Sequence, residues 1–166
     1  MKNKLIVLLA VWVLMPHQGK AQVVVPDQDQ PTKLGKTVYG LGFAAGAGTG
    51  LGVSFRHHLP TEFSYQIVGG IIKVDTKLQY DIGIEAQFDL VRGETTRFFA
   101  GGGFAYFYSG ESGTNTLNGP FRVAIGVGGE FSTVRLVNFT LEGMFTYFND
   151  GTVLPLPQVG IHYYFF

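Results

Sequence analysis

Few residues of this chain have the types and spacing that chemistry requires. His57 and His58 are adjacent, but a metal site would need further ligands at a recognisable spacing, which the sequence does not offer. Segment 46–52 is glycine-rich, yet it contains no Gly-Lys-Ser/Thr and is followed by a predicted strand, whereas a phosphate-binding loop needs a following helix. The sequence therefore predicts no metal site and no cofactor, and favours a glycine-rich hairpin turn.

Nucleophilic catalysis is also not indicated. A hydrolase or acyltransferase would need a nucleophile, a base and an orienting group together. Ser54 and Ser64 fall on the polar phase of their segments, and no histidine is expected at the same end beside them. We therefore expect a protein that is not an enzyme, with a membrane-embedded lipid-modifying enzyme as one alternative.

Charged residues recur on one phase of segments in which apolar and polar residues alternate. Inside a narrow barrel such charges must pair or neutralise. We expect Glu85 and Glu142 to couple to Arg56 or Arg122, and His162 to join them. An ion path is the weaker reading, because eight strands leave an interior only wide enough for side chains. The predicted interior polar network consists of Arg56, Asp81, Glu85, Asp89, Arg122, Glu130 and Glu142.

The elements that position these residues are strands. From Thr37 onward the alternation has a period of two, and no helical period of useful length occurs. The phase is clear at 77–90, where Ile82 and Ile84 oppose Gly83 and Glu85, and ambiguous in the third, fifth and eighth strands. Eight strands are predicted, at 37–45, 50–57, 62–72, 77–90, 97–108, 121–131, 138–148 and 156–166. The segments 46–49, 72–76, 109–120 and 149–155 are expected to be loops at one end, facing the cell exterior.

The N-terminal segment of the chain indicates export. Lys2 and Lys4 precede an apolar run at 5–15, and small residues Gly19 and Ala21 suit cleavage before Gln22. We expect a signal peptide at 1–21, a flexible lead-in at 22–36 and a barrel at 37–166. The mature chain would carry nine basic and twelve acidic residues, which argues against nucleic acid as a partner, and the absence of cysteine excludes disulfides.

Composition and aromatic placement favour a membrane. Charged residues form 14% of the chain, against about 25% in typical soluble domains. A soluble lipocalin-like barrel would place the apolar phase inside, but the polar phase is rich in Gly and Ala and nearly lacks Lys, which suits a barrel lining. One aromatic per strand falls at the predicted periplasmic rim, as in an aromatic girdle. Its members are Tyr39, Phe55, Phe63, Phe88, Phe98, Phe131, Phe139 and Phe165.

These features resemble the small eight-stranded outer-membrane barrels of the OmpA and OmpX type over residues 37–166. The resemblance implies an all-β, antiparallel, up-and-down transmembrane barrel in the outer membrane of a Gram-negative bacterium. It implies contact with outer-membrane lipid and with the barrel-assembly machinery, for which Tyr163, Phe165 and Phe166 would form the C-terminal insertion signal. Phe166 departs from the family pattern, because it stands one step off the outward phase of the last strand.

The expected function is a structural or surface-binding role without catalysis. The loops are short except for 109–120, which leaves little surface for a receptor. A small accessory subunit of a larger outer-membrane transport, secretion or assembly complex is therefore an alternative. A soluble lipocalin-like ligand-binding barrel is another.

Overall fold

The computed structural model describes residues 37–166 except 94, 112, 135 and 166. The predicted signal peptide and lead-in lie outside the described residues. Among the described residues, no helix is long and apolar enough to cross a membrane.

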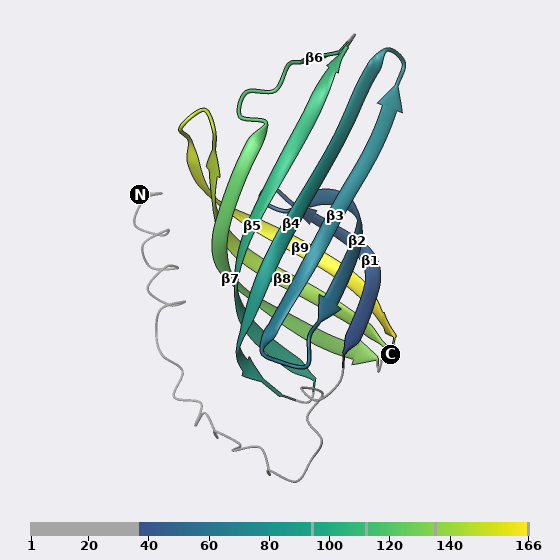
Figure 1. Ribbon diagram of the computed structural model, residues 1–166, viewed down its shortest axis with the longest axis vertical. Coiled ribbons are helices and arrows are strands. Elements are labelled where there is room, and N and C mark those ends of the chain that lie inside the picture. The colour runs from purple at the N-terminus through teal and green to yellow at the C-terminus, as the bar shows by residue number, and fades with distance from the viewer. Residues whose placement is uncertain (1–36, 94, 112, 135, 166) are drawn as a thin grey trace, which may run out of the picture. The chain divides into compact units, whose positions relative to one another are not determined.

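Eight strands close into an antiparallel barrel in which each barrel strand pairs with its neighbours along the chain and β1 pairs with β9 (Figure 1). The all-β, eight-stranded up-and-down architecture is therefore confirmed. A ninth strand, β6, has only two residues and pairs with β5 outside the ring. The strands are β1 Val38–Gly46, β2 Gly50–His58, β3 Phe63–Val74, β4 Lys77–Arg92, β5 Thr96–Glu111, β6 Thr114–Asn115, β7 Phe121–Val134, β8 Val137–Phe148 and β9 Val153–Phe165.

Three strands extend well beyond the others at the end opposite the start of β1 and the end of β9. We call the end that holds Val38 and Phe165 the terminal end, and the opposite one the loop end. At the loop end β3, β4 and β5 continue above the rest of the wall (Figure 1). The segment 72–76, which we expected to be a loop, is mostly strand, and only Asp75 and Thr76 form the turn, with Asp75 at φ 53°.

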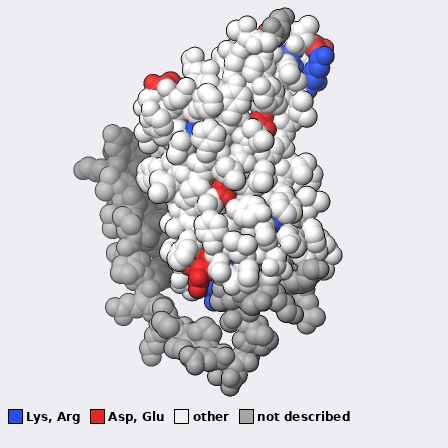
Figure 2. Space-filling view, viewed as in Figure 1, with Lys and Arg blue, Asp and Glu red and all other residues white. Residues whose placement is uncertain are grey.

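Polarity is inverted relative to a soluble barrel. Apolar side chains such as Ile84, Ile125 and Phe145 point outward and are exposed, whereas Gln66, Glu85 and Thr146 are buried. Figure 2 shows the result on one face, where uncharged residues dominate the wall. The ambiguous strands resolve in the same way: Phe63 and Ile67 of β3, and Phe98 and Phe104 of β5, face outward.

The glycine-rich turn between β1 and β2 folds into the barrel. Thr49 is only 2% exposed, and Gly48 and Gly50 are buried. Gln158 of β9 accepts hydrogen bonds from the Gly48 amide at 3.2 Å and the Thr49 hydroxyl at 3.1 Å. The hairpin turn predicted at 46–49 is present, but it folds inward instead of facing the cell exterior, because glycine and alanine on the facing strands leave room for it inside.

A substitution at Gly83 tests whether the β1–β2 turn packs inside the barrel. A Cβ at Gly83 would overlap the Thr49 carbonyl, so Gly83→Ala should destabilise the barrel by about 1–3 kcal/mol. Gly143→Ala is the matched control, since a Cβ there meets nothing within 4 Å. The measurement is urea unfolding in lipid vesicles, followed by circular dichroism. Equal stability of the two variants would mean that the turn does not rest on Gly83.

The inward turn leaves one side of the loop end unpaired. β1 pairs with β9 only as far as Ala45 and Val159, so the β9 residues before Val159 lack a partner on that side. On the other side of this opening in the wall, β3 pairs with β2 only as far as Gly69. Even-numbered residues of β9 bond to β8, as the Tyr164 amide does to the Leu136 carbonyl. The backbone nitrogens of Pro155 and Pro157, which carry no hydrogen, therefore face the unpaired edge, where proline is tolerated.

Candidate functional site

The barrel interior near the terminal end holds a network of charged and polar side chains, centred on Glu130 of β7. Its Oε2 accepts hydrogen bonds from Arg56 Nη1 at 2.6 Å, Arg97 Nη2 at 3.0 Å and the Tyr164 hydroxyl at 2.7 Å. Arg56 is 1% exposed and Arg97 5%. One carboxylate thus lies between two buried guanidinium groups, which is the condition under which a buried charge is tolerated.

Both arginines have further partners. Arg97 Nη1 donates to Asp89 Oδ1 at 2.7 Å, and Asp89 also pairs with Arg92. Arg56 donates through Nε to Gln66 Oε1 at 2.8 Å and through Nη1 to Thr140 Oγ1 at 3.0 Å. The network therefore ties strands on opposite sides of the ring to one another, which braces the barrel.

Two acids lie higher in the interior. Glu142 Oε1 is 4.0 Å from Arg56 Nη2, and Glu142 Oε2 accepts a hydrogen bond from Gln158 Nε2 at 3.1 Å. Glu85 Oε1 accepts from Gln87 Nε2 at 2.8 Å, while its Oε2 has no partner among the described residues. Since Gln158 also holds the inward turn, a chain of contacts leads from the turn through Glu142 to Arg56.

Asp81 and Arg122 do not lie with the other five predicted network residues. Asp81 Oδ1 accepts a hydrogen bond from the Leu51 amide at 2.7 Å, so it anchors the start of β2. The Arg122 guanidinium stacks on Phe107 and Phe148, with its Cζ 3.8 Å and 4.8 Å from the ring centroids. Of the two cations that we expected beside Glu85 and Glu142, Arg56 lies near Glu142, whereas Arg122 lies at the loop end.

Sequence reasoning missed Arg97, His58 and Tyr164. His58 Nε2 lies 2.8 Å from the Tyr164 hydroxyl. The signal for Arg97 was available: the aromatic girdle placed Phe98 outward, and alternation then turns Arg97 and Phe99 inward. Phe99 fits inside because Gly128 faces it, and Arg97 stacks over its ring at 4.4 Å.

One serine and one histidine meet inside the barrel. Ser54 Oγ lies 2.8 Å from His162 Nε2, a pairing the sequence analysis did not expect. His162 Nδ1 has no partner among the described residues, so no acid orients the ring, and both side chains are 0% exposed. His57 contacts Tyr65 at 3.0 Å, and the described residues contain no cluster of three metal-binding side chains.

A filled interior should not conduct. In planar-bilayer recordings we expect no large, steady pore, because the network and the inward turn occupy the interior that eight strands enclose. An unrelated porin of known conductance, reconstituted in the same way, serves as the control. Steady porin-sized steps from the purified chain would contradict this arrangement.

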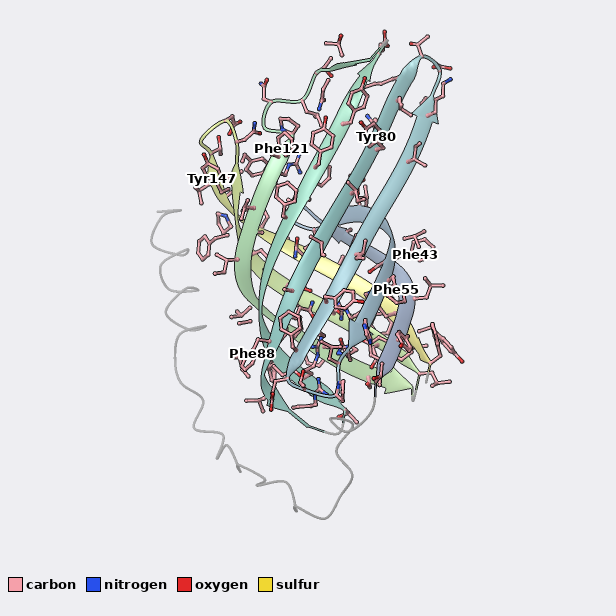
Figure 3. The ribbon with its side chains drawn as sticks, in the orientation of Figure 1. Phe43, Phe55, Tyr80, Phe88, Phe121 and Tyr147 are labelled. Atoms are coloured by element: carbon pink, nitrogen blue, oxygen red, sulfur yellow. The ribbon has the colours of Figure 1, made fainter. Side chains whose placement is uncertain are left out.

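Aromatic side chains form a belt at each end of the wall. All eight predicted girdle residues lie near the terminal end; Tyr39 stacks 6.2 Å from both Phe55 and Phe165, and Phe98 meets Phe131 at 6.3 Å. A second belt at the loop end was not predicted. This upper belt includes Tyr80, Tyr106, Phe121 and Tyr147. Figure 3 labels Tyr80, Phe121 and Tyr147 and shows them at the end opposite Phe55 and Phe88.

The last strand keeps one phase to its end. Tyr163 and Phe165 of the predicted insertion signal point outward, 52% and 43% exposed. Phe166 lies outside the described residues.

The chain is similar in fold to small outer-membrane barrels. Ail of Yersinia pestis in a phospholipid bilayer nanodisc matches with a TM-score of 0.45 and 12% identity, over 79% of this chain and 99% of Ail. The crystal structure of Ail gives 0.39 and 14%, over 78% and 95%. Neisserial surface protein A gives 0.35 and 14%, over 77% and 91%. No protein-family model matches, and no curated protein is similar in sequence.

Proposed function

We propose that this chain is an integral outer-membrane β-barrel protein of a Gram-negative bacterium, without catalytic activity, of the OmpA and OmpX type. The observation that carries the proposal is the inverted polarity: an exposed apolar wall between two aromatic belts encloses a buried polar interior. In water that wall would be a very large exposed hydrophobic surface, whereas in lipid it is the favoured surface. A soluble lipocalin-like barrel would have the opposite arrangement.

This location predicts a fractionation result. After removal of residues 1–21, the protein should sediment with the outer membrane and resist extraction by high salt and by carbonate. A heat-modifiable shift in gel mobility should accompany it, since such barrels resist unfolding by detergent. A soluble periplasmic protein of the same cells serves as the control. Recovery of this chain as a folded monomer in the soluble periplasm would contradict the proposal.

The loop end supports a surface-binding role. The extension of β3, β4 and β5 continues past Tyr80 and Tyr106 of the upper belt, so it would stand outside the bilayer. Residues of β3 beyond Gly69 have no partner on the β2 side, and Ile71 is 74% exposed. An exposed sheet edge is a surface on which another chain can pair.

A second candidate is the small accessory barrel of a larger membrane complex. A notch with a volume of about 310 Å³ interrupts the outward wall at Gly143, next to Pro155 and Pro157. It lies midway along β8 between the belt residues Phe139 and Tyr147, where a partner side chain could pack in the membrane. Copurification in mild detergent distinguishes the candidates: a stoichiometric partner that is lost in Gly143→Leu would favour the accessory role.

A further inference from the structure

The open side of the loop end faces the membrane boundary. Its two margins are the unpaired edges of β9, at 153–158, and of β3, at 71–74, and its floor is the inward β1–β2 turn. Belt residues stand beside both margins, since Ile71 pairs with Tyr80 and Val153 with Tyr147. The opening therefore lies at the level of the upper aromatic belt, which in a membrane protein marks the lipid–water interface.

Apolar side chains line this opening from within. Ile72 and Val74 share the face of β3 that points inward at Val68, and Leu154 shares the face of β9 that points inward at Gln158. Ile72 is 54% exposed, Val74 62% and Leu154 43%. These residues face the interior side of the wall but stay exposed, because β1 and β2 end lower than their neighbours.

Arg122 supplies a cation within the same end. Its guanidinium is held in place by the rings of Phe107 and Phe148, yet its single hydrogen bond among the described residues is from Nε to the Gly119 carbonyl at 3.4 Å. Asp81 interacts with the charge of Arg122, but its hydrogen bond is to the Leu51 amide, and Asp150 accepts one from the Thr152 amide at 2.9 Å. The terminal N–H groups of Arg122 are left to bind another acceptor.

We propose that the loop end binds a long-chain fatty acid, with its carboxylate on Arg122 and its chain passing over the β1–β2 turn between the two unpaired edges. A fixed, planar guanidinium matches a carboxylate in bidentate geometry. The opening has the width of two strands, about 10 Å, which suits one alkyl chain better than the several chains of a membrane lipid. This inference rests on the proposed membrane location, since only there does the opening meet a source of alkyl chains.

The test uses the purified, folded barrel in dodecyl maltoside and palmitate labelled with ¹³C at its carboxyl carbon. We expect a carboxyl resonance distinct from that of palmitate in empty micelles. Arg122→Gln should weaken binding about tenfold or more, because a charge-assisted hydrogen-bond pair is lost. Lys77→Gln removes an exposed cation from the β3–β4 hairpin and should leave binding unchanged. Methyl palmitate should not compete.

Three results would overturn the proposal. They are a wild-type spectrum identical to that of empty micelles, undiminished binding by Arg122→Gln, and displacement of palmitate by the methyl ester or, at lower concentration, by an alkyl phosphate. If Arg122→Gln did not fold, as judged by its gel mobility, Leu154→Asp provides the equivalent test at the chain. Because the experiment uses purified protein, its failure would leave the fractionation result, and thus the membrane location, untouched.

Discussion

Glu130→Gln should destabilise the barrel by about 3–5 kcal/mol, the cost of leaving a buried ionic group without its partner. The variant keeps the shape of the side chain but removes the charge that lies between Arg56 and Arg97, at 2.6 Å and 3.0 Å. Two buried guanidinium groups then face each other without a shared carboxylate. Urea unfolding in lipid vesicles, followed by circular dichroism, measures the loss.

Glu62→Gln is the control, because Glu62 is exposed in the β2–β3 turn and should change stability by less than about 0.5 kcal/mol. Adding Arg56→Leu to Glu130→Gln should recover part of the loss, since it removes the arginine whose remaining carboxylate partner, Glu142, is 4.0 Å away. A Glu130 variant as stable as the control, or strictly additive effects in the double variant, would show that these charges do not act as a unit.

Ile84→Arg and Ile125→Arg should each cost about 2–4 kcal/mol in a bilayer. Both side chains point outward from the middle of their strands, 50% and 69% exposed. A guanidinium there would have to leave water for hydrocarbon or distort the bilayer around it. The free energy of unfolding in vesicles, with gel mobility as a check on folding, measures the effect.

Leu78→Arg provides the matched control. Leu78 shares the outward face of β4 with Ile84, but it lies beyond Tyr80 of the upper belt, near the tip of the β3–β4 hairpin. The same change of residue should therefore cost little there, because the tip stays in water. If all three arginine variants were equally stable, the outward face would not be in contact with lipid, and the membrane location would be in doubt.

The strands and their faces could be predicted from the sequence, because alternation assigns each residue to a face wherever one phase is clearly polar. Glu85 and Gln87 of β4 followed directly from Ile84 and Phe88. In β5 both phases contain phenylalanine, so alternation alone did not decide, and Arg97 was missed. Its inward position followed only from combining Phe98 with the belt.

Height within the barrel could not be predicted, because alternation says nothing about how far each strand is shifted against the next. Arg122 and Glu130 share a phase of β7, yet one lies at the loop end and the other in the network near the terminal end. That shift depends on turn geometry and on three-dimensional packing. The inward path of the glycine-rich turn escaped prediction for the same reason: it requires Gly83, Gly103 and Ala124, on three different strands, to face it at one level.

The prolines of β9 also have a consequence for how the ring closes. β1 and β9 meet in seven pairs, from Tyr39 and Phe165 to Ala45 and Val159. A slip of two residues in one direction would bring Pro157 opposite Ala45, where no N–H could be donated. A slip in the other direction would place Val159 beyond Gly46, where β1 has already turned inward. The closing seam therefore has a stop on each side, which favours the observed alignment of β1 with β9.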